Sequence, residues 1–314
     1  MASRGKTGPG FVYGPVPSRR LGFSLGVDII PFKTCTLDCV YCQLGPSSRT
    51  TVRRRAFYDP KAVVRSVLEA VTTSGRIDVI TFSGSGEPTL NRSLGGIIRG
   101  IKKRTRIPVV VLTNGTLLHR RDVRRDLAEA DIVVPDLDAA TAGLFAKVNR
   151  PDKALSLDRM LGGLEAFRRE FKGQIWLEVM LVAGINDSPA HVRRLRKIID
   201  AAGADKVQLN TVVRPPAVRT ARPLSEARMR AICKALGPTC EVVASFPKKA
   251  RARSGTGLER AILDTVRRRP VTASDIAASL GGEPGRVASV LDALVAAGRL
   301  RSVRHGGRTF FEPR

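Results

Sequence analysis

The chain of 314 residues has no apolar run near the roughly 20 residues that a membrane-spanning helix needs. It contains only five cysteines, an odd number, and no charged-then-apolar leader opens it. These absences argue against a membrane partner and against a disulfide framework. We therefore expect a soluble, cytoplasmic protein that is long enough for a full-sized core and a second small domain.

Three of the five cysteines lie within eight residues, as Cys35, Cys39 and Cys42. This C-x₃-C-x₂-C spacing brings three thiolates to one centre, whereas a structural zinc site has four protein ligands. A [4Fe–4S] cluster on three thiolates keeps one iron open for another molecule. Zinc with a fourth ligand from one of the three distant histidines, and inert thiols, remain as alternatives. The spacing favours the iron–sulfur cluster and chemistry at its open iron.

Strand-like and helix-like segments alternate over residues 25–236. The expected strands are largely continuous in apolar character, as strands buried on both faces are. They cover 25–30, 77–83, 107–112, 131–137, 175–182 and 207–212, and the expected helices cover 60–72, 92–104, 121–129, 156–171, 189–202 and 225–236. This alternation predicts an α/β fold with a parallel sheet and right-handed crossovers. An open doubly wound sheet is the alternative to a partial barrel.

The distinctive polar segments come after the predicted strands, where parallel α/β folds collect their chemistry. The cysteine loop follows the first strand. The later strands run into residues 82–89, 113–115, 136–138, 182–186 and 208–211. We therefore expect these segments to meet at one edge of the sheet.

A basic segment poor in apolar residues, 248–257, is typical of a linker. It predicts three regions: a barrel at 1–247, this linker, and a domain at 258–314. In the last region we expect a helix near 258–268, a second helix capped by Thr272 and Asp275, a third beginning at Pro284, and two short strands. Three helices and a hairpin resemble a winged-helix domain.

The net charge is +26, which favours a polyanionic partner such as RNA. The charge is spread along the chain, because residues 251–314 hold 12 Lys and Arg against 6 Asp and Glu. Arg304 and Arg308 are candidates for phosphate contacts. An arginine-rich composition from a GC-rich genome explains the charge as well.

The cysteine triplet, with Tyr41 before its last member, resembles the signature of the radical S-adenosylmethionine (SAM) superfamily. The resemblance implies a partial (β/α)6 TIM-like barrel with a [4Fe–4S] cluster on Cys35, Cys39 and Cys42. It also implies that SAM chelates the open iron and is cleaved reductively to a 5′-deoxyadenosyl radical. A reducing partner such as flavodoxin or ferredoxin would supply the electron.

Further segments resemble the SAM-binding elements of that superfamily. Gly84, Gly86 and Glu87 match its Gly-Gly-Glu-Pro motif, with Ser85 in place of the second glycine. The resemblance makes these residues candidate SAM contacts, together with Tyr41, Asn114 and Asp138. Asn114 and Asp138 are equally typical of turns and caps. Glu178 and Asn210 are further candidates if their side chains point inward.

The N-terminal block at 14–28 resembles a branch of Fe–S oxidoreductases related to the enzymes that form the wyosine base of tRNA. No cysteine precedes Cys35, so the second cluster of those enzymes is not expected here. Cys233 and Cys240 are too few for another cluster, and we expect buried structural thiols. Arg19 and Arg20 are candidates for a phosphate or carboxylate contact, or are simply solvated.

The resemblance implies a radical SAM enzyme that abstracts hydrogen from an unidentified substrate, for which RNA or another macromolecule is a candidate. One alternative is an iron–sulfur redox regulator that binds DNA through the winged helix. The other is a radical SAM enzyme for a small molecule, with the winged helix as a docking module.

Overall fold

The computed structural model of the chain describes residues 10–18, 20–46, 50–244, 258–267, 269–280 and 284–314. Within these residues the larger region contains an eight-stranded sheet in which each strand pairs with the next one in sequence. β1 runs antiparallel to β2, and every later pair is parallel. The strands are β1 (Val12–Ser18), β2 (Gly22–Val27), β3 (Val79–Phe82), β4 (Val109–Thr113), β5 (Ile132–Pro135), β6 (Gln174–Leu181), β7 (Lys206–Thr211) and β8 (Cys240–Val242).

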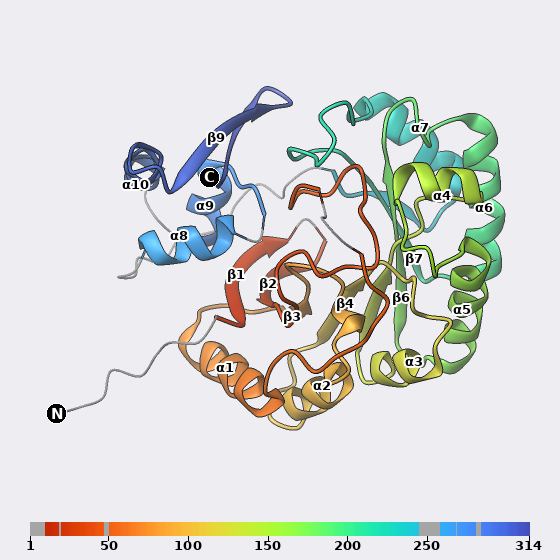
Figure 1. Cartoon of the computed structure of the whole chain (residues 1–314), viewed down its shortest axis with the longest axis horizontal. Coiled ribbons are helices and arrows are strands. Elements are labelled where there is room, and N and C mark those ends of the chain that lie inside the picture. Colours follow the sequence, from red (N-terminus) through yellow and green to blue (C-terminus); the bar gives the residue numbers. More distant parts are fainter. Residues whose placement is uncertain (1–9, 19, 47–49, 245–257, 268, 281–283) are drawn as a thin grey trace.

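The helices lie on the outer face of this sheet, and the sheet curves around an interior that is open on one side (Figure 1). They are α1 (Pro60–Thr73), α2 (Leu94–Lys102), α3 (Arg121–Leu127), α4 (Ala142–Val148), α5 (Leu157–Glu170), α6 (Pro189–Ala202) and α7 (Glu226–Leu236), with a short 3₁₀ helix η1 (Pro88–Leu90). A doubly wound sheet reverses its strand order at a switch point. The sequential order found here excludes that alternative and confirms the α/β fold of a partial barrel.

The six predicted strands appear as β2–β7, and they and their helices follow the predicted alternation. All four residues of β3 are buried, which is why the segment has continuous apolar character. Helix starts also follow the sequence: Asp59 accepts from two backbone N–H groups at the start of α1, and Ser188 accepts from the N–H of His191 in α6. The predicted pattern therefore encodes both the strands and the beginnings of the helices.

Four elements in the described part of the barrel region were not predicted: β1, η1, α4 and β8. β1 contains Gly14, Pro15 and Pro17, which argue against a strand in a sheet interior. It forms nevertheless because it is an edge strand, with an irregular register between Tyr13 and Val16. Proline is tolerated at such an edge because the missing N–H faces no partner strand. α4 and β8 are seven and three residues long, too short for a clear periodicity.

The C-terminal region has its own buried core and the predicted order of elements. Thr272 and Asp275 form the predicted capping box, in which each side chain accepts from the other residue's N–H, at 3.1 and 3.2 Å. The elements are α8 (Leu258–Val266), α9 (Ala273–Leu280), α10 (Pro284–Ala296), β9 (Leu300–His305) and β10 (Arg308–Pro313), with β9 and β10 paired antiparallel.

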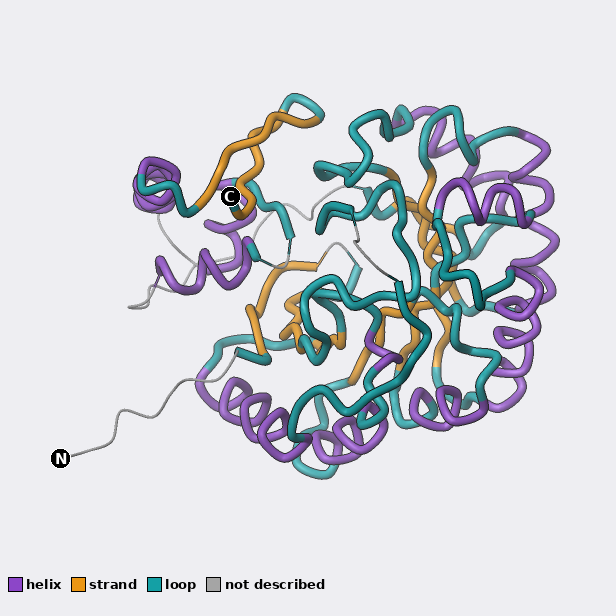
Figure 2. The backbone as a smooth tube through the Cα atoms, viewed as in Figure 1, coloured by secondary structure: helices purple, strands orange, loops and turns teal. Residues whose placement is uncertain are grey.

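This region lies against the open side of the barrel (Figure 2). α8 and α9 pack beside β1. Nε2 of His305 lies 2.9 Å from the backbone oxygen of Val212, in the loop that follows β7. The predicted linker 248–257 falls outside the described residues. No helix in the described part of the chain is long and apolar enough to cross a membrane.

Candidate active site

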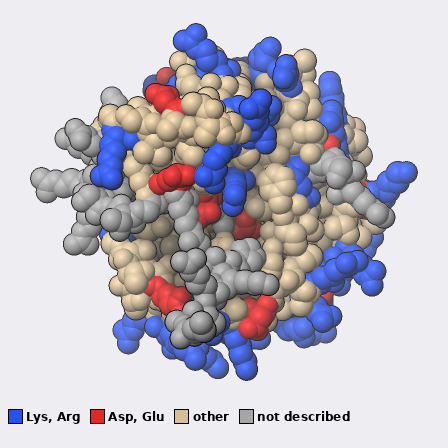
Figure 3. Space-filling model, turned by 60° about the vertical axis from the view of Figure 1, so that its left-hand side comes forward, with Lys and Arg blue, Asp and Glu red and all other residues tan. Residues whose placement is uncertain are grey.

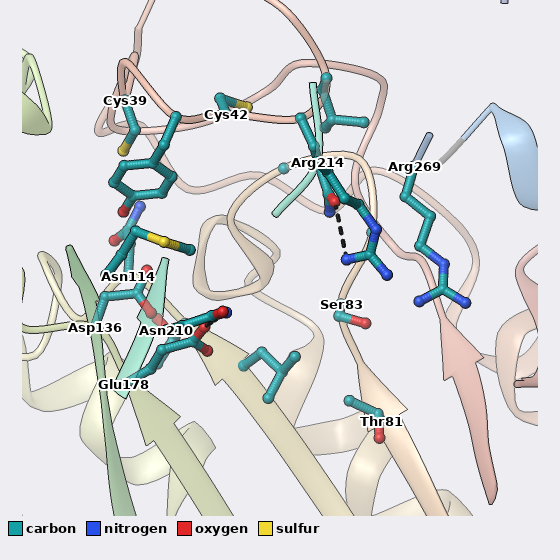
Figure 4. A pocket seen from close by; sticks show the side chains of 18 of the residues that line it. Cys39, Cys42, Thr81, Ser83, Asn114, Asp136, Glu178, Asn210, Arg214 and Arg269 are labelled. Atoms are coloured by element: carbon teal, nitrogen blue, oxygen red, sulfur yellow. Dashed lines mark hydrogen bonds between the residues drawn. The ribbon is translucent and has the colours of Figure 1, made fainter. Parts of the chain in front are cut away.

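A cavity of about 370 Å³ lies inside the barrel at the carboxyl ends of the strands. Its size is within the range of small-ligand sites. Figure 4 shows side chains from the cysteine loop, from several strand ends and from the C-terminal region around it. Eight predicted site residues line it: Cys35, Cys39, Cys42, Tyr41, Gly84, Gly86, Glu87 and Asn114. Strand ends far apart in sequence therefore meet the cysteine loop, as expected.

Each thiol of the cysteine loop lies near one nitrogen donor. The amide nitrogen of Asn114 is 3.5 Å from Sγ of Cys35, and that of Asn149 is 3.6 Å from Sγ of Cys39. Nζ of Lys33 is 3.6 Å from the third sulfur, Cys42. Donors placed in this way stabilise negative charge on sulfur and tune the potential of a cluster.

Burial raises the pKa of the Cys35 thiol to about 12 and that of Cys39 well above its ordinary value. The negative charge of Glu87 adds to the effect on Cys35. Without a bound cation both sulfurs therefore stay protonated at neutral pH. A metal centre would supply the positive charge that stabilises the thiolates. Three thiols lining one cavity, each with a nitrogen donor, fit a [4Fe–4S] cluster with one iron open to that cavity.

Among the described residues, no three His, Cys, Asp or Glu side chains gather closely enough to hold a single metal ion. The three thiolates of a [4Fe–4S] cluster bind different irons.

The glycine-rich turn after β3 is joined to the cysteine loop through backbone hydrogen bonds. The N–H of Lys33 donates to the oxygen of Ser85 at 2.7 Å, and the N–H of Glu87 donates to the oxygen of Thr34 at 3.0 Å. A Cβ on Gly86 would overlap that Thr34 oxygen. Glycine is therefore required at position 86 for the two segments to approach so closely.

Ser85 replaces a glycine of the superfamily motif and has a structural role. Its Oγ donates to Oδ2 of Asp28 at 2.6 Å, and its N–H donates to the same oxygen at 3.1 Å. Gly84 has φ +143°, and a Cβ there would overlap the Asp28 side chain. The serine thus fixes the turn to the segment that follows β2.

Glu87 is 2% exposed, and both of its carboxylate oxygens accept hydrogen bonds from the protein. Oε1 accepts from the N–H and hydroxyl of Thr89 and from the hydroxyl of Thr113, at 2.6–3.0 Å. Oε2 accepts from the N–H of Asn114 at 2.7 Å. Burial raises the pKa of Glu87, and these hydrogen bonds oppose the increase. The carboxylate joins the glycine-rich turn to the end of β4 and so positions the wall of the cavity.

Asn114 lies at the end of β4, as predicted, and its side chain is also engaged. Nδ2 donates to the hydroxyl of Thr36 at 2.7 Å, and Oδ1 accepts from the N–H of Thr116 at 3.1 Å. The residue therefore links β4 to the cysteine loop while lining the cavity.

Asp138 does not line the main cavity. It is 3% exposed, and its carboxylate accepts from the Tyr41 hydroxyl, from Asn149 at 2.7 Å and from the N–H of Met180 at 2.8 Å. Burial, as the largest cause, raises its pKa to about 6. Asp138 holds the ring of Tyr41 in place behind the cysteine loop, whereas Asp136, which was not predicted as a site residue, faces the cavity (Figure 4).

The side of the cavity formed by β6 and β7 carries a buried polar network. Arg20 forms an ion pair with Glu178 and donates to Gln208 at 3.2 Å. Asn210 donates to the other oxygen of Glu178 at 2.9 Å. The inward direction considered for Glu178 and Asn210 is confirmed (Figure 4). Arg20 contacts a carboxylate of the protein itself, and Arg19 falls outside the described residues.

Two arginines that line the cavity were not predicted as site residues, Arg214 and Arg269. Arg214 follows β7, and Arg269 comes from the C-terminal region after α8. Arg214 lies in the segment 210–216, which resembles the same Fe–S oxidoreductase branch as the N-terminal block, whereas no sequence signal distinguishes Arg269. Cys233 and Cys240 are partly buried free cysteines that pack against the barrel core, apart from the lining of the cavity.

The chain belongs to the radical SAM superfamily, whose sequence model matches residues 29–195. This superfamily uses a [4Fe–4S] cluster and SAM, so the protein is an enzyme with these cofactors. A crystal structure of Streptococcus suis SuiB bound to S-adenosylmethionine has the same fold, with a TM-score of 0.54 and 14% identity over 71% of this chain and 51% of that one.

Among relatives, a protein of Brachyspira hyodysenteriae named GTPase Obg is 40% identical over 92% of this chain and 43% of its own length. A UPF0026 protein of Methanocaldococcus jannaschii is 38% identical over 67% of this chain and 66% of its own length. The chain thus spans less than two thirds of these two relatives. A probable dual-specificity RNA methyltransferase RlmN of a Synechococcus species is 25% identical over 62% of the chain and 53% of its own length.

Proposed function

We propose that the protein cleaves SAM reductively and abstracts a hydrogen atom from an organic substrate held in the cavity. One observation carries the proposal: the three thiols of Cys35, Cys39 and Cys42 line the same cavity as the glycine-rich turn after β3. When bound, the reduced cluster would supply one electron to the sulfonium of SAM, whose S–C5′ bond would break to give methionine and a 5′-deoxyadenosyl radical. The electron would come from a donor such as flavodoxin or ferredoxin.

Some residues of the site are assigned to direct contacts with SAM, and others to positioning the residues that make those contacts. We assign the backbone of Tyr41 and the Gly84–Gly86 turn to SAM, because small residues and exposed backbone groups permit a close approach. Asn114 lies beside both the Cys35 sulfur and the cavity, which suits a contact to SAM. Glu87 and Asp138 position these groups, since their carboxylates accept hydrogen bonds from the protein.

The test is anaerobic reconstitution of the full chain with iron and sulfide, followed by reduction with SAM present. The expected products are methionine and 5′-deoxyadenosine, detected by mass spectrometry. An intact cluster that yields no 5′-deoxyadenosine with any low-potential reductant would contradict the proposal.

For the substrate we propose RNA, within the Fe–S oxidoreductase branch that the N-terminal block resembles. The net charge of +26 and the similarity to a named RNA methyltransferase support this class. Basic side chains are spread around the face shown in Figure 3, rather than gathered in one stripe. RNA that copurifies with the protein should be digested, and its modified nucleosides identified. The same nucleosides are then measured in RNA from a strain that lacks the protein.

Residues 258–314 have the helix–helix–helix–hairpin order of a winged-helix domain, and we propose that assignment. The domain would border the cavity, because Arg269 lines it. This position favours a role beside the active site over the alternative of a separate DNA-binding regulator. The small-molecule alternative shares the same catalytic centre and predicts turnover without any nucleic acid.

A further inference from the structure

Acidic and basic side chains lie on opposite sides of the cavity (Figure 4). Figure 4 shows Asp136 and Glu178 on one side and Arg214 and Arg269 on the other. The charge of Glu178 is balanced within the protein by Arg20. The two arginines therefore give the opposite side of the cavity a local excess of positive charge.

The side chain of Arg269 carries an unsatisfied donor. Its Nε is buried and has no hydrogen-bond partner among the described residues, and its guanidinium points into the cavity (Figure 4). A buried donor without a partner is unfavourable and uncommon in native proteins. Such a group is satisfied when a ligand supplies the acceptor.

Arg214 lies over the end of the cysteine loop. Its Nη1 donates to Oε1 of Gln43 at 3.4 Å, which directs the rest of its guanidinium toward the same cavity (Figure 4). Arginine presents five N–H donors in a planar fork that suits phosphate and carboxylate oxygens. Hydroxyl groups lie on this side as well, since Ser83 and Tyr13 line the cavity and their oxygens are 2.8 Å apart.

We propose that Arg214 and Arg269 form a subsite for an anionic group of the substrate, either a phosphate or a carboxylate. This inference rests on the proposed function, because it assigns the SAM carboxylate to the open iron and so leaves the arginines for the substrate. One arginine comes from the barrel and the other from the C-terminal region. That region is therefore part of the active site and contributes to substrate specificity.

The position of Arg269 is held by contacts on both sides of it. Helix α8 precedes Arg269 and packs beside β1. The backbone N–H of Arg269 donates to the oxygen of Thr265 in the last turn of α8. His305 joins the hairpin to the loop after β7, two residues before Arg214. These contacts place the two arginines in one binding site although they are 55 residues apart in sequence.

The test measures binding of inorganic phosphate and, separately, acetate to the reconstituted, SAM-loaded full chain by calorimetry. Phosphate bound more tightly than acetate indicates a phosphorylated substrate, and the reverse order indicates a carboxylate. In Arg269→Gln the affinity for the preferred anion should fall about tenfold, equivalent to about 1.4 kcal/mol. The matched control is Arg267→Gln, an exposed arginine two residues away, whose affinity should change less than about twofold.

Three results would overturn the proposal: neither anion binds the wild type, both variants lose affinity equally, or Arg269→Gln loses SAM affinity by the same factor. Arg269→Lys keeps the charge without the planar fork, so its affinity should lie between those of wild type and Arg269→Gln. If Arg269→Gln does not fold, the comparison of Arg269→Lys with Arg267→Gln decides, and equal affinities reject the subsite. Failure of the proposed function is separate, because it appears as absent 5′-deoxyadenosine while anion binding persists.

Discussion

The two sides of the cavity are built in different ways. On the cofactor side, Glu87 and Asn114 use their polar groups to fasten the glycine-rich turn and β4 to the cysteine loop. On the side of Arg214 and Arg269, long side chains reach in from separate regions, and one buried nitrogen has no described partner. A wall whose polar groups are already hydrogen-bonded within the protein suits cofactors that are the same in every turnover. An unsatisfied donor such as Nε of Arg269 suits a ligand that enters and leaves.

The largest effect is expected from Cys39→Ser. Serine is a poor ligand for iron, so the variant should lose most of its cluster and form 5′-deoxyadenosine only at background level. Iron content and visible absorbance after reconstitution measure this loss. Cys233→Ser is the matched control, since that thiol packs against the barrel core away from the cavity. A Cys39→Ser protein with the iron content of the wild type would show that Cys39 is not a ligand.

Gly86→Ala tests the close contact between the glycine-rich turn and the cysteine loop on the cofactor side. The added methyl group would overlap the Thr34 oxygen, and overpacking of this kind costs about 1–3 kcal/mol of unfolding free energy. Urea unfolding of the metal-free protein measures the change. Gly162→Ala in α5 is the control, because nothing lies within 4 Å of its added methyl group. Alanine in a helix should stabilise the protein by about 0.5–1 kcal/mol. Equal stability of the two variants would reject the tight contact.

Ser85→Ala removes only the hydroxyl that donates to Asp28. We expect a loss of about 1 kcal/mol in unfolding free energy, because the Ser85 N–H continues to donate to the same carboxylate. The coupling to Asp28 is measured in a double-mutant cycle with Asp28→Asn. Independent effects of the two substitutions would show that the serine does not fasten the turn.

The sequence predicts the cofactor side better than the other side because its signals are local. Strands β3, β4 and β5 are largely continuous apolar segments, and the three cysteines lie within eight residues. Asp138 was expected beside SAM because it follows a strand, but beyond β5 the chain turns and its carboxylate binds the N–H of Met180 instead. Arg269 reaches the cavity only because α8 packs beside β1, a contact that no local pattern encodes.

The smallest effect on stability is expected from Arg269→Met, which removes the buried nitrogen but keeps an unbranched apolar stem. On the cofactor side, Gly86→Ala and Ser85→Ala should destabilise the protein, because the first overpacks a close contact and the second removes a paired hydroxyl. Removing an unsatisfied donor relieves a desolvation penalty, so here the unfolding free energy should stay the same or rise by about 0.5 kcal/mol. Urea unfolding measures the change, and Arg267→Met, which replaces an exposed arginine, is the reference variant. A loss above about 1 kcal/mol would mean that Arg269 supports the fold, and the contrast between the two sides of the cavity would then fail.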